Sequence, residues 1–189
     1  MVLQRLFRLW VYGGFLAGIL LLALTPLLAQ GWSPALTAVW LLLPIYMLHQ
    51  FEEHDNDRFR AFVNQHIGHG REALTLPVVF IVNVPGVWGV IALATYLAAW
   101  VRPGLGLIAS YLVLVNILAH IGSAVQLRRY NPGLYTALTL FPLFGGWSVI
   151  ALNREGASFG DHLIGLVVAV AIHAAIVVSV KRRLATLGG

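Results

Sequence analysis

Six uninterrupted apolar segments, each of about 20 residues, constrain the fold of this chain more than any other feature of its sequence. Each can cross about 30 Å of hydrocarbon at a helical rise of about 1.5 Å per residue. Because a bilayer core holds no water, a spanning segment satisfies its own backbone hydrogen bonds as an α-helix. The segments cover residues 8–29, 35–54, 75–100, 104–127, 133–152 and 161–181. The sequence therefore predicts an all-α fold class, a polytopic membrane helical bundle with about six transmembrane helices.

The composition excludes most other classes of protein. Of the 189 residues, 59% are hydrophobic and 10% are charged, whereas about a quarter of an ordinary soluble domain is charged. The absence of Cys excludes a disulfide scaffold, and the net charge of +5 is carried near the segment ends, as membrane topology requires. We therefore expect no nucleic-acid partner. No repeat or linker interrupts the chain, so we expect one transmembrane helical domain over residues 1–189.

The basic residues predict the orientation of the bundle. Ten of the twelve Lys and Arg residues fall on one side of the predicted spans, and Arg102 and Arg154 fall on the other. The ten are Arg5, Arg8, Arg58, Arg60, Arg71, Arg128, Arg129, Lys181, Arg182 and Arg183. Since basic residues collect on the cytoplasmic side, both termini are expected to be cytoplasmic. For a bacterial chain, this places the protein in the inner (cytoplasmic) membrane.

The longest connection, residues 55–73, has the pattern of an interfacial helix. Phe59, Phe62, Val63 and Ile67 recur at helical spacing among polar residues. The sequence therefore predicts an amphipathic segment along the cytoplasmic interface, where it can close over whatever the bundle encloses.

Three local patterns predict the ends of the segments. Ser158 and Asp161 have the spacing of a capped helix start. Asn131 followed by Pro132 indicates an N-cap and a first helical residue. His54, at the boundary of its segment, is expected to be a solvated interface residue.

The second segment ends in a group of ionisable residues. His49, Glu52 and Glu53 stand at i, i+3 and i+4, so one imidazole and two carboxylates share a helical face. An ionisable residue in hydrocarbon costs at least about 2.5–3.5 kcal/mol, which makes such a group informative. The simpler interpretation is a helix end that reaches into water.

Polar residues in three other segments lie at a similar depth. His120 and His173 each precede the basic end of their segment by eight residues, or about 12 Å. Asn116 shares a face with His120, and Asn83 lies at a comparable level in the third segment. Each residue alone can be a polar bridge between helices, but the common depth predicts one shared site in the cytoplasmic half.

The residue types in this layer indicate a metal centre. His-x-x-Glu-Glu has the ligand spacing of the inverted zincin pattern His-x-x-Glu-His, and imidazole with carboxylate suits a divalent metal, with zinc favoured over iron. The predicted ligands are His49, Glu53, His120 and His173. Glu52 is the predicted general base, and Asn116 is predicted to position the substrate. Asn83 is predicted to orient a metal ligand through a hydrogen bond or to stabilise an oxyanion.

The chain resembles the HXXEE-motif membrane proteins of bacteria, a family of unknown function. The matching pieces are His49-Gln50-Phe51-Glu52-Glu53, Asn116-Ile117-Leu118-Ala119-His120 and Tyr130-Asn131-Pro132-Gly133. The resemblance covers most of the chain after the first segment and implies a multi-helix membrane protein suspected of being an enzyme. It also implies functional roles for His49, Glu52, Glu53, Asn116 and His120, but it names no substrate.

A weaker similarity to the CAAX-type prenyl proteases fails at one position. Those intramembrane enzymes use Glu-Glu-x-x-x-Arg, whereas here Asp57 stands where Arg is required and Arg58 comes one residue late. This departure counts against a protease of that type.

The sequence therefore favours an intramembrane metalloenzyme, a metal-dependent hydrolase of a lipidic or amphipathic substrate at the cytoplasmic leaflet. The expected partners are membrane lipid and that small-molecule substrate. The alternatives are a di-iron membrane oxidase or hydroxylase, a proton or metal-ion transporter, and a structural subunit of a membrane complex. The sequence leaves the oligomeric state open.

Overall fold

The computed structural model describes residues 2–188, all of whose regular elements are helices. In chain order they are α1 (Val2–Leu28), α2 (Pro34–His54), η1 (Asp55–Asp57), α3 (Arg58–His66), α4 (Leu76–Ile81), η2 (Val82–Trp88), α5 (Gly89–Trp100), η3 (Pro103–Gly106), α6 (Leu107–Leu127), α7 (Leu134–Arg154) and α8 (Phe159–Leu187). These elements make six helical runs long and apolar enough to cross a membrane. The prediction of an all-α bundle with about six spans is confirmed.

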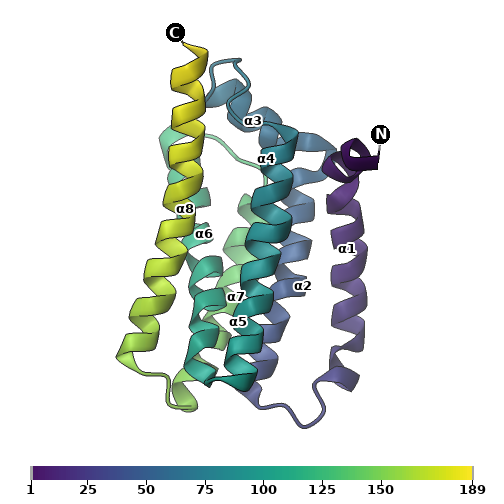
Figure 1. The fold of residues 1–189 in the computed structure, drawn as a ribbon, viewed down its shortest axis with the longest axis vertical. Helices are drawn as coiled ribbons and strands as arrows, with labels where there is room; N and C mark the ends of the chain where they lie inside the picture. Colours follow the sequence, from purple (N-terminus) through teal and green to yellow (C-terminus); the bar gives the residue numbers. More distant parts are fainter. Residues whose placement is uncertain (1, 189) are drawn as a thin grey trace.

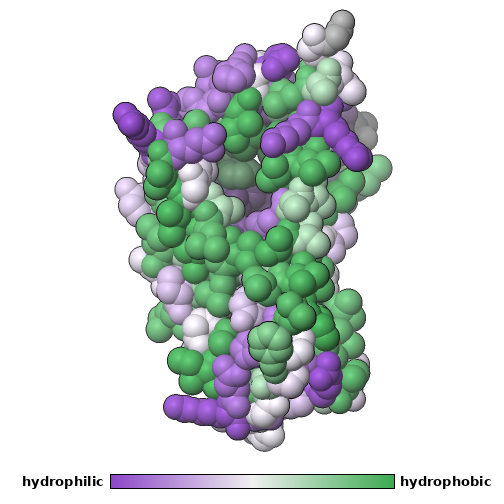
Figure 2. All heavy atoms as spheres, turned by 90° about the vertical axis from the view of Figure 1, so that its left-hand side faces the viewer, coloured by the Kyte–Doolittle hydropathy of each residue, from purple (hydrophilic) through white to green (hydrophobic). Residues whose placement is uncertain are grey.

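The six long helices stand side by side, and both ends of the chain lie at the same end of the bundle (Figure 1). We call this the terminal end. The short helix α3 lies across it, within the segment predicted to be interfacial. The outer surface is hydrophobic between two hydrophilic ends, as expected of a membrane protein (Figure 2). The side of the membrane on which the terminal end lies stays a prediction.

Helix α2 forms the centre of the bundle, where it packs against α1, α5, α6 and α7. Ala35, Ala38, Val39 and Leu42 on this helix are all at most 1% exposed. Small side chains allow neighbouring helices to approach closely, which favours tight packing in a membrane. The central position of α2 brings its polar end beneath α3, inside the bundle.

The third span consists of α4, η2 and α5, and η2 is a π-helical turn. Pro85 lies inside it and has no backbone N–H to donate to the preceding turn. The widened turn also contains Asn83, whose side chain is buried. The irregularity therefore lies at the level of the predicted site.

Polar bonds fix the beginning of α8 at the end opposite the terminal end. The Ser158 hydroxyl accepts from the Asp161 backbone N–H, and the Asp161 carboxylate accepts from the Ser158 backbone N–H. The other oxygen of Asp161 lies 2.7 Å from Arg102 Nη1. The predicted capped start of this helix is confirmed.

The predicted start of α7 is wrong by two residues. Gly133, with φ +94°, occupies the N-cap, and the helix begins at Leu134, whereas Asn131 had been expected at the cap. The Asn131 side chain is buried and pairs with His120 instead. A side chain engaged by another helix is not free to cap its own.

Candidate metal centre

Two helices bring three potential metal ligands together near the terminal end. His49 and Glu53 are one turn apart on α2, and His120 comes from the facing side of α6. Glu53 Oε2 lies 3.5 Å from His49 Nε2, and Glu53 Oε1 lies 3.8 Å from His120 Nε2. One ligand atom from each residue fits within 4.8 Å of the other two, and all three residues are buried. We call these three residues the triad.

The proton on His49 is fixed by α7. His49 Nδ1 lies 2.8 Å from the hydroxyl oxygen of Thr136. That hydroxyl donates to Glu52 Oε2 at 2.5 Å, because a carboxylate can only accept. The hydroxyl oxygen therefore accepts from Nδ1–H, and the lone pair of His49 lies on Nε2, facing Glu53.

The proton on His120 is fixed by the connection before α7. His120 Nδ1 lies 2.6 Å from Asn131 Oδ1, while Asn131 Nδ2 donates to the backbone oxygen of His120 at 2.9 Å. This second bond identifies Oδ1 as the acceptor. The lone pair of His120 is therefore also on Nε2, and it faces Glu53 as well.

The atoms that the triad directs toward its centre, the two Nε2 lone pairs and the Glu53 carboxylate, are thus all hydrogen-bond acceptors. His49 Nε2 has no hydrogen-bond partner among residues 2–188, although it is fully buried. Such an arrangement is costly unless a cation lies among the acceptors. In a tetrahedral zinc site with bonds of about 2.0–2.1 Å, neighbouring ligand atoms are about 3.3–3.5 Å apart. The two distances here run to different oxygens of Glu53, and with one atom per residue the three lie within 4.8 Å, so they would draw closer around an ion. Two imidazoles and one carboxylate are also the protein ligands of several zinc hydrolases.

Glu52 lies outside the triad. Its carboxylate accepts from the Tyr130 hydroxyl at 2.7 Å and from the backbone N–H groups of Tyr135 and Thr136 at 3.1 and 2.7 Å. Together with the Thr136 hydroxyl, these donors surround it at the start of α7. Glu52 is therefore connected to His49 by hydrogen bonds through the Thr136 hydroxyl. Its predicted role as general base stays a prediction.

The predicted residues Asn116 and His173 line the same cavity as Glu53 and His120. Asn116 Nδ2 donates to the Tyr46 hydroxyl at 2.9 Å, and its Oδ1 is buried without a partner among the described residues. His173 Nδ1 donates to the Ala169 carbonyl at 2.8 Å, which leaves Nε2 as its lone-pair nitrogen. Both residues remain candidates for the roles that the sequence predicts.

Asn83 belongs to a separate buried network. Its Oδ1 accepts from Gln50 Nε2 at 2.9 Å, and Gln50 Oε1 accepts from Trp88 Nε1 at 2.5 Å. Its Nδ2 donates to the Val79 carbonyl at 2.8 Å. No described bond connects Asn83 to the triad, so its predicted role beside a metal ligand stays untested.

His54 was expected to be solvated, and this expectation is wrong. The residue is 6% exposed and its ring packs against Trp10 and Phe59. Its Nε2 lies 3.2 Å from Glu53 Oε2. The sequence offered little signal for this position, because successive residues of a helix point in different directions.

A cavity of about 770 Å³ lies beside the triad, within the usual range for small-molecule sites. Its polar residues include Glu53, His54, His120 and Asn116, and α3 and α8 contribute much of its apolar wall. Figure 2 shows a hollow in the face where α6 and α8 lie, inside the hydrophobic belt and below the hydrophilic terminal end. The cavity is therefore open sideways, toward membrane hydrocarbon.

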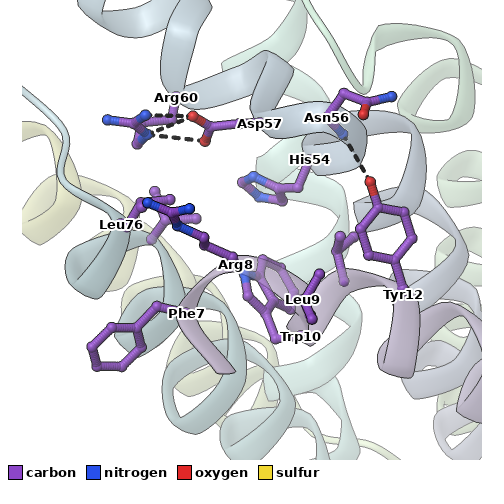
Figure 3. Close-up of a pocket in the computed structure, with 12 residues that line it drawn as sticks. Phe7, Arg8, Leu9, Trp10, Tyr12, His54, Asn56, Asp57, Arg60 and Leu76 are labelled. Carbon is purple, nitrogen blue, oxygen red and sulfur yellow. Dashed lines mark hydrogen bonds and ion pairs between the residues drawn. The ribbon is translucent and has the colours of Figure 1, made fainter. Parts of the chain in front are cut away.

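A second cavity, of about 300 Å³, lies between the start of α1 and α3. Arg8, Trp10 and Arg60 are among the residues that line it, and His54 points into it (Figure 3). His54 also lines the larger cavity. Val79 lines both cavities as well, so these two side chains lie between them.

Gly133 packs directly on the triad. A methyl group at its Cα would come within 2.7 Å of His120 Cε1 and 2.9 Å of His49 Cε1, closer than carbon atoms approach. Its φ of +94° is also a conformation that suits glycine. Gly133, Asn131 and Thr136 were all missed as site residues, and the signal available was the Tyr130–Gly133 motif, which was interpreted as a cap and turn.

A family model described as "Protein of unknown function with HXXEE motif" matches residues 40–148 of the chain. Neither a curated protein nor a solved structure matches it. The matched region contains the whole triad, together with Asn131 and Thr136. His173 lies outside it.

Proposed function

We propose that this protein, which belongs to the family of proteins of unknown function with an HXXEE motif, is a metal-dependent membrane hydrolase. The triad of His49, Glu53 and His120 would hold the ion. The observation that carries the proposal is that the two imidazoles have their lone pairs on Nε2, toward one carboxylate, so that the triad itself supplies no donor there. A cation among these buried acceptors would offset the cost of leaving them without a donor.

Two imidazoles and a carboxylate suit zinc and also non-haem iron, and of these we propose zinc, the metal that several hydrolases hold with this ligand set. A divalent ion held there supplies Lewis acidity, which polarises a substrate oxygen or activates water. His173 is the proposed additional ligand. Asn116 Oδ1, which has no partner, is suited to accept a hydrogen bond from a substrate or from water in the cavity.

The proposed substrate is lipidic or amphipathic, because the cavity is walled largely by apolar residues and opens within the hydrophobic belt (Figure 2). A soluble polar substrate would have to leave water to reach the triad, whereas the acyl chains of a membrane lipid already lie in the hydrocarbon into which the cavity opens. The cytoplasmic leaflet of a bacterial inner membrane is the proposed location.

Metal analysis of the full-length protein, purified in detergent without added chelator, tests the proposal. We expect about one zinc per chain, lost in His120→Ala and Glu53→Gln. His69→Ala removes a histidine outside the triad and should retain the ion. An iron pair in place of zinc would favour the oxidase alternative, and a metal-free protein whose thermal midpoint does not respond to zinc would contradict both.

A further inference from the structure

The rim of the larger cavity carries positive charge at the terminal end. Lys181 on α8 lines the cavity and forms no ion pair among residues 2–188. Arg129 does not line the cavity itself but donates to His66, a lining residue on α3, with 3.2 Å between Nη1 and Nε2. One cation therefore lines the cavity and a second contacts a lining residue, and neither has a carboxylate partner among the described residues.

The carboxylates at this end are engaged elsewhere. Asp57 and Glu72 both pair with Arg60, and Asp55 pairs with Arg58. Glu52 is bound at the start of α7, as described above. Among the described residues that line the cavity, Glu53 is the one carboxylate, and it lies at the triad. The rim thus lacks the negative charge that would neutralise Lys181 and Arg129.

Lys181 and His173, the proposed additional ligand, are separated along the axis of α8. Lys181 follows His173 by eight residues of continuous helix, or about 12 Å. Between these two positions, Ile176, Val177 and Val180 give the wall an apolar character. A substrate that matches this arrangement would carry an anionic group at the rim and its reactive bond deeper in the cavity, near the triad.

We propose that the substrate of the triad is an anionic glycerophospholipid, with its phosphate headgroup at Lys181 and Arg129 and one ester-linked acyl chain in the cavity. This proposal rests on the proposed hydrolase function. A lipid of this class already has its headgroup at the interface and its ester below it. The hollow in the face of α6 and α8 lets the chain enter sideways, without crossing the polar end of the bundle (Figure 2).

The reaction is the hydrolysis of an acyl ester by water. The oxygen of water forms a bond with the carbonyl carbon, and the bond from that carbon to the glycerol oxygen breaks. One proton of water passes to the glycerol oxygen, and the products are a fatty acid and a lysophospholipid. No oxidant or reductant is needed.

Binding measured on zinc-free full-length protein tests headgroup recognition without turnover. Fluorescently labelled phosphatidylglycerol and phosphatidylcholine with identical chains are titrated into the protein in detergent. One cation near a headgroup contributes about fivefold to affinity, so two predict a preference of about 25-fold for phosphatidylglycerol. We expect Lys181→Gln to reduce this preference about fivefold, whereas Arg182→Gln, on the neighbouring residue that does not line the cavity, leaves it unchanged.

Equal binding of the two lipids, or a preference that Lys181→Gln does not alter, would overturn the proposal. Glycerol 3-phosphate that competes as well as the whole lipid would also overturn it, because a free phosphate would then be the ligand. A separate assay follows fatty-acid release from phosphatidylglycerol by zinc-loaded protein. Selective binding without release would refute the hydrolase while leaving headgroup recognition established.

Discussion

The imidazole of His49 and the carboxylate of Glu52 lie one turn apart on α2 and are joined through a single hydroxyl group, that of Thr136 on α7. The hydroxyl donates to the carboxylate and accepts from the imidazole. A carboxylate behind a metal-binding imidazole fixes its tautomer and raises its basicity, and here the effect passes through one intervening oxygen.

Removal of this hydroxyl is expected to weaken zinc binding. Thr136→Val keeps the shape of the side chain but leaves His49 Nδ1–H without its acceptor, and loss of such a partner lowers metal affinity about 10- to 100-fold. Competition against a fluorescent chelator measures the affinity. Thr136→Ser should restore most of it. Thr139→Val, on the exposed side of the same helix, is the control, and a Thr136→Val protein with wild-type affinity would contradict the tautomer assignment.

A methyl group at Gly133 is expected to displace the imidazoles. Gly133→Ala places Cβ against both His49 and His120, and it also meets the strain of a positive φ. Gly156→Ala is the matched control, because its φ of +87° imposes similar strain while nothing lies within 4 Å of the added carbon. We expect loss of zinc in the first variant only. Equal zinc content in the two variants would show that Gly133 is needed for backbone conformation alone.

The buried Gln50 network is expected to contribute to stability independently of the metal. Gln50→Leu leaves Asn83 Oδ1 and the Trp88 N–H without partners, at about 1–3 kcal/mol for each unsatisfied group. The thermal midpoint in detergent should fall by several degrees, with and without zinc. Gln65→Leu, on exposed α3, should leave the midpoint nearly unchanged. A drop confined to the zinc-loaded protein would instead connect this network to the triad.

Tyr130 provides a prediction that depends on pH. Burial first, and then its hydrogen bond to Glu52, raise the pKa of Tyr130 to about 12. Because this pKa is raised in the folded state, the bond stabilises the protein fully below about pH 10, the pKa of free tyrosine, and is lost as the pH rises toward 12. Both the wild type and Tyr130→Phe are titrated by ultraviolet absorbance, and the difference between the two curves isolates the Tyr130 phenol.

Glu52→Gln removes the negative charge beside the phenol and should bring its pKa back toward 10. A Tyr130 phenol that titrates near pH 10 in the wild type would contradict the contact. Since Tyr130 is 40% exposed, solvent screens the interaction and the effect on stability is expected to be small.

The bundle and the depth of the polar layer were predictable because both follow from one-dimensional patterns. Segment length gives the spans, and the rise per residue gives the depth of His120 and His173. The spacing of His49 and Glu53 likewise fixes their common face before any tertiary contact is known. These inferences need only the geometry of a single helix.

The surroundings of the triad were not predictable in this way. Thr136 and Asn131 act across helices, and no spacing within one segment shows which side chain a neighbouring helix will meet. Asn131 and Pro132 fit a helix start as well as they fit the observed loop, because the same residue types serve both. Glu52 shares the side of α2 that carries His49 and Glu53, but Tyr130 and the start of α7 together provide four donors that hold it away from the triad.

The polar anchor at the beginning of α8 has a mechanical consequence. Asp161 is held by Ser158 and Arg102, whereas Val177, at the opening of the cavity, is 53% exposed. These positions are 16 residues apart on α8, or about 24 Å along the helix axis. A tilt of about 5° about the anchor moves Val177 by roughly 2 Å. The width of the cavity opening therefore depends on an ion pair at the opposite end of the bundle.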